Sequence, residues 1–182
     1  MRNNYAFQKS INGKDIKLLR SRMEMTQADF AAFAGVSQKT VERWESGKEE
    51  ITGPVTRIVR FLWEDPYLCR RYTVPEQILA LRLSYYYNDI LCTIIDVDEP
   101  HRHIEVVNFT KQYEYRAFGI NDSPTFEEYE EFLESRCFPR SRDKMKLALQ
   151  ELNLPFYDPL MIIEKTGGRM AEDDFRIEIK RL

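Results

Sequence analysis

The chain of 182 residues is poor in the residues that build covalent or metal-based frameworks. Its three cysteines, Cys69, Cys92 and Cys137, are widely spaced and form no Cys-x-x-Cys pair. An odd, scattered set of cysteines excludes a disulfide framework and is typical of a reducing compartment. The only histidines, His101 and His103, have no further cysteine or histidine at ligand spacing. We therefore expect neither a metal ion nor another cofactor.

Long apolar runs are also absent. The best candidate for a membrane span is interrupted by Arg82, whereas a spanning helix needs about 20 predominantly apolar residues. Residues 1–9 carry polar side chains where a signal peptide would have its apolar core. With 43% hydrophobic and 13% aromatic residues, the chain can still bury a core. We expect a folded cytoplasmic protein that does not enter a membrane.

Charge is distributed unevenly along the chain. The net charge is -3, but residues 1–74 hold 13 lysines and arginines against 9 acidic residues, whereas residues 75–182 hold 14 against 21. The balances are +4 and -7. A basic part can approach phosphate, while an acidic part suits a basic protein groove or solvent. This change, at the turn-forming residues 73–75, predicts two domains, 1–74 and 75–182.

The most informative segment reads TQADFAAFAGVSQKTVERWESG. Thr26 stands where an N-cap belongs, with Asp29 three residues later as in a capping box. Gly35 suits a turn that needs a positive φ angle, and Ser37 is a second N-cap. Gly47 ends the second helix as a C′ glycine would. The pattern predicts two short helices around a tight turn.

Polar side chains are expected to point outward from the second of these helices. They are Gln38, Lys39, Thr40 and Arg43. Side chains of this kind read base edges and hold phosphates in a major groove. The segment therefore predicts binding to double-stranded DNA. The alternative is a module for dimerisation or protein docking, in which these side chains form a solvated face.

The order of these residues resembles the helix-turn-helix of the Xre/Cro/C1-type repressor family, over about residues 16–72. Within that family it is most similar to the DNA-binding part of MqsA-type antitoxins. The resemblance implies phosphate contacts from Gln27 and Ser37, and base contacts from Gln38, Lys39 and Arg43. The family often has a small polar residue where Lys39 stands, so a phosphate contact is the alternative for Lys39. Lys48 is expected to contact phosphate in any DNA sequence.

Apolar periodicity predicts an α+β protein whose first domain is all-α with five helices. The first helix is expected at residues 15–23, the next two form the helix-turn-helix, and Pro54 and Pro66 begin the last two. Single helix-turn-helix units read few bases, so we expect a homodimer.

The second domain is expected to contain a small antiparallel sheet and about three helices. Alternating β-branched and apolar residues predict strands at 91–97, 103–109, 113–118 and 174–181. Start and stop signals predict helices from Ser123-Pro124 to residue 137, from Ser141 to residue 152, and over residues 159–165. Residues 76–87 are interpreted as a further helix, and the apolar segment 78–87 as part of a dimer interface.

The helix around residues 126–136 carries glutamates off its apolar stripe: Glu127, Glu128, Glu130, Glu131 and Glu134. A charged face opposite an apolar stripe is ordinarily a solvated face. The alternative is an acidic ridge that imitates nucleic acid in the basic groove of a partner.

Asp96, Asp98 and Glu99 lie close in sequence to His101 and His103. Such a cluster can hold a divalent ion in a nuclease, but a β-turn prefers the same residues. No nuclease motif accompanies the cluster, so we expect no catalytic residues and no enzyme activity.

The length, the helix-turn-helix and three short runs resemble a Cas9-inhibiting anti-CRISPR protein of mobile genetic elements. The runs are residues 134–142, 157–159 and 168–174. The resemblance implies two roles: autorepression through operator DNA, and binding of Cas9 or its complex with guide RNA. The alternatives are an antitoxin-like or phage-type repressor without Cas9 activity, and a nuclease.

Overall fold

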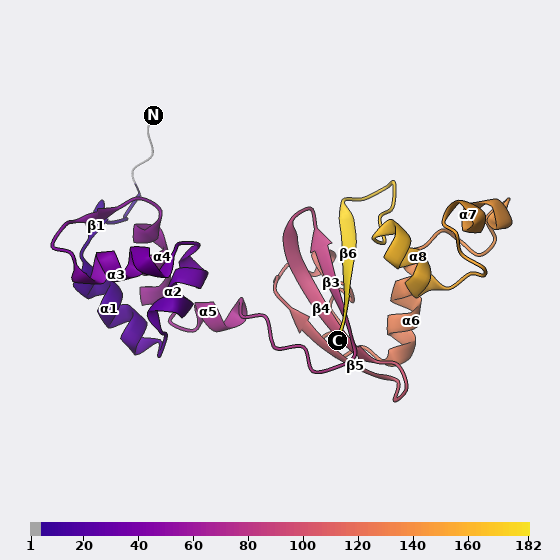
Figure 1. Cartoon of the computed structure of the whole chain (residues 1–182), viewed down its shortest axis with the longest axis horizontal. Helices are drawn as coiled ribbons and strands as arrows, with labels where there is room; N and C mark the ends of the chain where they lie inside the picture. The colour runs from indigo at the N-terminus through magenta and orange to yellow at the C-terminus, as the bar shows by residue number, and fades with distance from the viewer. Residues whose placement is uncertain (1–4) are drawn as a thin grey trace. The chain divides into compact units, whose positions relative to one another are not determined.

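In the computed structural model, residues 5–182 are described, and they form two compact units (Figure 1). The first unit ends at Val74 and the second runs from Pro75 to Leu182. The amino-terminal helices and the carboxy-terminal antiparallel sheet with helices confirm the α+β class. None of the described helices combines the length and the apolar composition that a membrane span requires.

The described part of the first unit contains five helices and one small strand pair. The helices are α1 (Gly13–Arg22), α2 (Gln27–Ala34), α3 (Gln38–Ser46), α4 (Val55–Glu64) and α5 (Leu68–Arg71). Strands β1 (Ser10–Ile11) and β2 (Ile51–Thr52) pair antiparallel. Ile11 and Ile51, which the sequence pattern did not place in strands, are buried against a core that includes Leu19, Phe30 and Leu62. The strand pair therefore closes one side of the helical core.

Local hydrogen bonds explain where α2 and α3 begin. The Thr26 hydroxyl accepts from the Asp29 amide at 3.1 Å, and the Asp29 carboxylate accepts from the Thr26 amide at 2.8 Å. Gly35 has φ of 67°, and the Ser37 hydroxyl accepts from a backbone amide of the first turn of α3. Gly47 differs from the C′ prediction, because its backbone is extended (φ -77°). A Cβ at this position would lie 2.9 Å from the Arg43 carbonyl oxygen, so close backbone approach explains the glycine.

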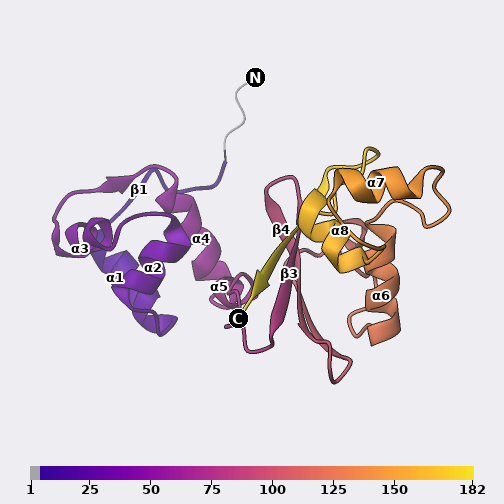
Figure 2. The ribbon, with the colours of Figure 1, turned by 45° about the vertical axis from the view of Figure 1, so that its right-hand side comes forward.

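The second unit is an antiparallel sheet with helices on one side, as Figures 1 and 2 show. Its strands are β3 (Leu81–Tyr87), β4 (Ile90–Asp98), β5 (His103–Asn108) and β6 (Phe175–Arg181), in the order β5-β4-β3-β6. Its helices are the 3-10 turn η1 (Tyr113–Tyr115), α6 (Phe126–Ser135), α7 (Met145–Glu151) and α8 (Pro159–Thr166). The core lies between the sheet and the helices, where Leu83 and Ile95 meet Tyr129 and Ile162.

The prediction of a helix over residues 76–87 is wrong, because this segment supplies the strand β3. Leu81, Leu83 and Tyr85 alternate onto the helix-covered face, and β3 pairs with both β4 and β6. These side chains are 4%, 0% and 5% exposed. These three side chains therefore belong to the core of one chain and are not available to a dimer interface. Tyr86 and Tyr87 are half-buried and Ile78 is 66% exposed, so the dimer interface over residues 78–87 stays a prediction for these positions.

A strand was also expected at residues 113–118, but η1 is found there. The Arg116 guanidinium donates to the Thr110 carbonyl at 2.7 Å, which folds the segment back on itself. Tyr115 packs against Tyr87 with ring centroids 4.5 Å apart. The alternation of aromatic and charged residues therefore reflects packing of a turn beside the sheet.

Two helix starts in the second unit differ from the prediction. Thr125, instead of Ser123, caps α6: its hydroxyl accepts from the Glu128 amide at 3.2 Å. Ser141 caps nothing, and α7 begins only after Lys144, which has φ of 61°. The predicted strands at 91–97, 103–109 and 174–181 and the helix at 159–165 are confirmed to within two residues at each end.

Candidate nucleic-acid interface

The second helix of the helix-turn-helix, α3, presents one polar face to solvent. With 3.6 residues per turn, the positions that lie on this face are all exposed: Gln38, Lys39, Glu42, Arg43 and Ser46. The opposite face contributes Val41, at 0% exposed, and the half-buried Trp44 to the core. The sequence therefore fixes the rotation of α3 about its axis.

The amino terminus of α1 also holds α3 in place. Gly13 is buried, and a Cβ there would lie 1.9 Å from the Trp44 carbonyl oxygen. No side chain larger than hydrogen can occupy this contact without moving one of the two helices. The position of α3 therefore depends on this close backbone contact with α1.

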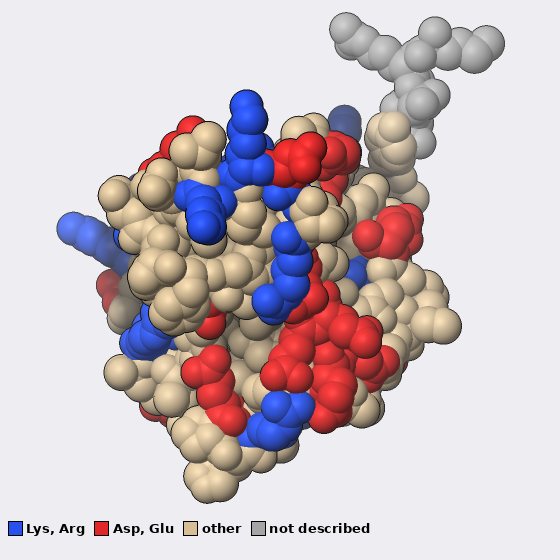
Figure 3. Space-filling view, turned by 90° about the vertical axis from the view of Figure 1, so that its right-hand side faces the viewer, with Lys and Arg blue, Asp and Glu red and all other residues tan. Residues whose placement is uncertain are grey.

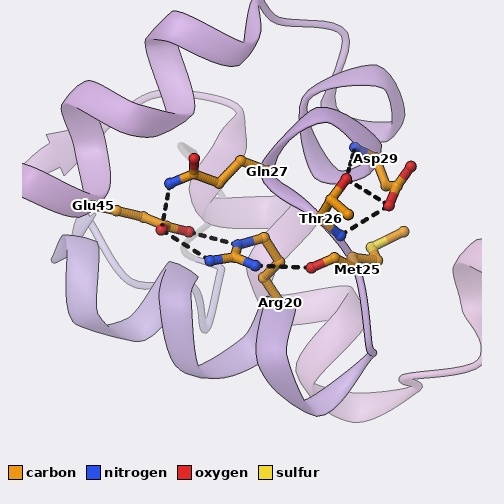
Figure 4. A network of polar contacts seen from close by, with 6 residues as sticks. All are labelled: Arg20, Met25, Thr26, Gln27, Asp29 and Glu45. Atoms are coloured by element: carbon orange, nitrogen blue, oxygen red, sulfur yellow. Dashed lines mark hydrogen bonds and ion pairs between the residues drawn. The ribbon is translucent and has the colours of Figure 1, made fainter.

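An ion-pair network joins α1, α2 and α3 (Figure 4). The Arg20 guanidinium donates to both Glu45 carboxylate oxygens, at 2.8 and 3.1 Å, and to the Met25 carbonyl at 2.8 Å. The Gln27 amide donates to Glu45 at 2.8 Å. The bond from Arg20 lowers the pKa of Glu45 below its usual value, and the bond to Glu45 raises the pKa of Arg20. The Glu45 side chain is only 6% exposed.

The sequence interpretation missed this network. Its partners are 25 residues apart, so spacing alone could not pair them. One signal was available: Glu45 lies four residues after Val41, on the buried face of α3. A buried carboxylate requires a cationic or hydrogen-bonding partner.

Several predicted contact residues have intramolecular roles in this structure. Gln27 belongs to the network, with one amide hydrogen bonded to Glu45. Ser37 caps α3 and lies 2.9 Å from the Thr40 hydroxyl oxygen, so the half-buried Thr40 supports the cap. Gln38 donates to Glu42 at 2.9 Å, which orients its amide on the exposed face. Glu42 is a residue of this face that the sequence interpretation did not single out.

The predicted cations of this region are unpaired. Among the described residues, no carboxylate lies within 4.0 Å of the side-chain nitrogens of Lys39, Arg43 or Lys48. Arg43 and Lys48 line one shallow depression after the end of α3, together with Glu49 and Glu50. The structure therefore brings Gln38, Lys39, Arg43 and Lys48 to the exposed side of α3 and its continuation.

A family model described as helix-turn-helix matches residues 16–55. These residues are an Xre/Cro/C1-type helix-turn-helix domain. The matched segment contains α2, α3 and the whole Arg20–Glu45 network. The presence of this domain supports the interpretation of the chain as a DNA-binding transcriptional regulator. None of the curated proteins matches the chain.

Four of the five predicted glutamates of α6 lie close to arginines or to backbone donors. Arg102 pairs with Glu127 at 2.8 Å and with Glu130 at 3.1 Å, and Arg140 pairs with Glu134 at 2.6 Å. Glu128 completes the capping box of α6. Glu131 is exposed and makes no ion pair among the described residues. Figure 3 shows acidic side chains gathered on the side of the second unit that carries the helices, with basic side chains beside them.

The acidic residues near the histidines are engaged with other groups. The Asp96 oxygens accept from the Arg82 guanidinium, both at 2.6 Å, in a pair that is almost fully buried. Asp98 lies 2.8 Å from the His101 ring nitrogen Nδ1. Within residues 5–182, no group of three or more acidic, histidine or cysteine side chains is arranged to hold a metal ion.

Proposed function

We propose that this chain is a transcriptional repressor that binds an operator in double-stranded DNA through α3. One observation carries the proposal. The exposed face of α3 holds Gln38, Lys39 and Arg43, and within residues 5–182 neither Lys39 nor Arg43 has a carboxylate partner. The Arg20–Glu45 network supports α3 from its buried side. Arginine and glutamine are side chains that pair with guanine and adenine edges in the major groove. Lys48, just beyond the helix, supplies a phosphate contact.

The operator-bound form in this proposal is a homodimer on a palindrome near the promoter of its own gene. The support is geometric, since one α3 reaches only a few base pairs and two related helices are needed for useful specificity. Leu81, Leu83 and Tyr85 of β3 do not contribute to the dimer surface in this proposal, because they are buried within one chain.

The test is a binding measurement at physiological salt. A fragment of its own promoter and a random fragment of equal length are titrated with the protein, and footprinting locates the protected bases. We expect specific binding to exceed random binding by at least about a thousandfold. Equal affinities would refute specific repression, and protection of a single half-site would refute the dimer.

We propose inhibition of Cas9 by the second unit as a second function. The resemblance to anti-CRISPR proteins motivates it, and the balance of 14 basic against 21 acidic residues in this unit supports it. Cas9 holds nucleic acid in positively charged channels. The α6 glutamates supply the candidate contacts: the exposed Glu127, Glu130, Glu131 and Glu134, and the half-buried Glu128. Arg102 and Arg140 reduce the negative potential of this face, so an incoming protein cation competes with them.

Cas9 cleavage of a plasmid, with and without the protein, tests this second function. Replacing Glu127, Glu130 and Glu134 by Lys should weaken inhibition, most strongly at low salt. A control variant carries the same charge change at the exposed residues Glu76, Glu114 and Glu151. The rival explanation is that α3 occupies the target DNA. Full inhibition by the triple variant, combined with loss of inhibition in Arg43→Ala, would favour DNA occupancy over the acidic face.

We propose no catalytic role for the residues around the histidines. The support is that Arg82 already occupies both oxygens of Asp96. Incubating the protein with single- and double-stranded nucleic acid in Mg²⁺ or Mn²⁺ is the check. Degradation that Asp98→Ala removes would overturn this proposal.

A further inference from the structure

A pocket of about 390 Å³ lies in the second unit between the end of α6 and the turn that follows α8. It is formed by two segments, residues 136–142 and 166–172, and by the inner side of α8. Apolar side chains, among them Phe138, Ile162 and Met170, make up much of its wall. Its volume lies within the range of small-molecule sites in proteins.

The pocket is distinguished by its arginines, because it is lined by arginines that have no carboxylate partner. The unit has nine arginines. Seven of them have a carboxylate within 4.0 Å: Arg82, Arg102, Arg116, Arg136, Arg140, Arg176 and Arg181. Among the described residues, Arg142 and Arg169 have none, and both line the pocket. In a unit with 21 acidic residues, two arginines that lack a carboxylate partner and line the same pocket point to an anion from outside the chain.

A buried framework fixes the two segments that carry these arginines. Arg136 is 7% exposed, and it donates to the Gly168 carbonyl at 3.0 and 2.7 Å and to Asp173 at 2.7 and 3.0 Å. Gly168 has φ of 60°, and a Cβ there would lie 3.0 Å from the Ile177 side chain. The pocket is therefore preformed, which lowers the entropy cost of holding a ligand.

The cysteine in the pocket wall indicates binding instead of covalent chemistry. The Cys137 thiol donates to the Leu133 carbonyl at 3.3 Å. Burial raises the pKa of this thiol to about 12. Because the thiolate is the nucleophile, Cys137 is inert at neutral pH.

We propose that this pocket binds a small organic anion, with its carboxylate or phosphate held by Arg142 and Arg169. The forked guanidinium matches both anionic groups. The apolar body of the ligand lies against Phe138, Ile162 and Met170. Glu172 also lines the pocket, and its carboxylate opposes the anion. The proposal is independent of operator binding and of Cas9.

The test uses the full chain and four probes: phenyl phosphate, benzoate, inorganic phosphate and uncharged benzyl alcohol. Amide chemical shifts are followed by NMR during each titration, and the spectra also report whether each variant is folded. We expect saturable shifts at residues 136–142 and 166–172 with at least one of the two aromatic anions. Tighter binding of phenyl phosphate would indicate a phosphate ligand, and tighter binding of benzoate would indicate a carboxylate ligand.

Three pocket variants and one matched control sharpen the test. Arg142→Gln and Arg169→Gln should each weaken binding of the anion roughly tenfold or more. Glu172→Gln should strengthen it, because the opposing charge is removed. The control, Arg140→Gln, loses the same charge in the same loop, but Arg140 is paired with Glu134 and does not line the pocket. Arg140→Gln should therefore bind the anion with the same affinity as the wild type.

Several results would overturn the proposal. One is the absence of a saturable response to phenyl phosphate and benzoate at millimolar concentration. Another is an equal response to benzyl alcohol, which would make the pocket merely apolar, or to inorganic phosphate alone, which would leave the apolar wall without a role. A last one is unchanged anion binding in both arginine variants. If these variants instead lower the salt dependence of DNA binding while no probe binds, the two arginines contact nucleic acid.

Discussion

The exposed face of α3 in the first unit and the arginines of the second unit differ in how far their positive charges are paired with carboxylates. In the first, the cations of α3 and the residue beyond it, Lys39, Arg43 and Lys48, have no carboxylate within reach among the described residues. In the second, seven of nine arginines are paired. Net charge alone would describe one unit as basic and the other as acidic. Ion pairing is more informative than net charge, because the cations without a carboxylate partner are the ones that can bind an external anion in either unit.

Each unit also contains a bidentate arginine–carboxylate pair in which both side chains are largely buried. In the first unit, Arg20 and Glu45 side chains are 16% and 6% exposed, and in the second, Arg82 and Asp96 are 8% and 6% exposed. Arg82 also donates to the Pro75 carbonyl at 2.9 Å, so it ties the beginning of the second unit to the sheet. Removing one partner of such a pair leaves a buried charge without compensation.

The largest effect is expected from Asp96→Ala. It leaves the Arg82 guanidinium buried without its carboxylate, and the free energy of unfolding of the second unit should fall by about 3–5 kcal/mol. Urea denaturation followed through NMR signals of β3 and β4 measures this. Asp98→Ala is the control, since its partner His101 is exposed, and should cost less than about 1 kcal/mol. Equal losses in the two variants would show that burial does not set the cost.

Glu45→Ala is expected to have a somewhat smaller effect, in the first unit. We expect a loss of roughly 3 kcal/mol, the low end for a buried pair, because Arg20 keeps partial contact with water and its bond to Met25. Arg20 of α1 and Gln27 of α2 lose their common partner on α3, so DNA affinity should fall as well. Unfolding of the second unit should not change. A variant that binds DNA with full affinity would show that the network does not position α3.

Local signals in the sequence predicted the site better than the fold of the second unit. Thr26, Asp29 and Ser37 act on backbone amides within three residues, so the starts of α2 and α3 could be predicted from the sequence alone. Gly35 is equally local, since it needs only a positive φ angle. For this reason Gln38, Lys39 and Arg43 were correctly predicted to be exposed, whereas Thr40 is half-buried and Glu42 was not singled out.

Distant partners decided the features that could not be predicted. The segment containing Leu81 and Leu83 was interpreted as a helix, yet it lies between β4 and β6, and β6 is about 90 residues later in the chain. The Arg20–Glu45 pair depends on how α1 and α3 pack. The pocket with Arg142 and Arg169 depends on Arg136 joining two loops. Periodicity within a window cannot identify partners at such separations.

Arg43→Ala should weaken binding to the operator by about 1–3 kcal/mol, because a bidentate contact to a base is lost. Binding to random DNA should change much less. Lys48→Ala should weaken both kinds of DNA alike and reduce the slope of affinity against salt by about one. The control from the second unit is Arg102→Ala, whose guanidinium is occupied by Glu127 and Glu130. If Arg102→Ala impairs DNA binding as much as Arg43→Ala, pairing does not distinguish the cations of the two units.

The smallest expected difference is the pH at which acid weakens two ion pairs, Arg20–Glu45 in the first unit and Arg136–Asp173 in the second. Arg20 lowers the pKa of Glu45 from its usual 4.5, and Arg136 lowers the pKa of Asp173 from its usual 3.8. A carboxylate whose folded-state pKa is lowered stabilises the protein fully above its unfolded value, and this contribution is lost as pH falls through the folded value. The contribution of Glu45 should therefore begin to decline near pH 4.5 and that of Asp173 near pH 3.8. Urea denaturation of each unit, repeated between neutral and acidic pH, measures the two declines. Glu45→Gln should remove only the first and Asp173→Asn only the second, because the amides do not titrate. If the first unit keeps the same pH dependence in Glu45→Gln, other carboxylates control its acid sensitivity, and the Arg20–Glu45 network does not set how the first unit responds to acid.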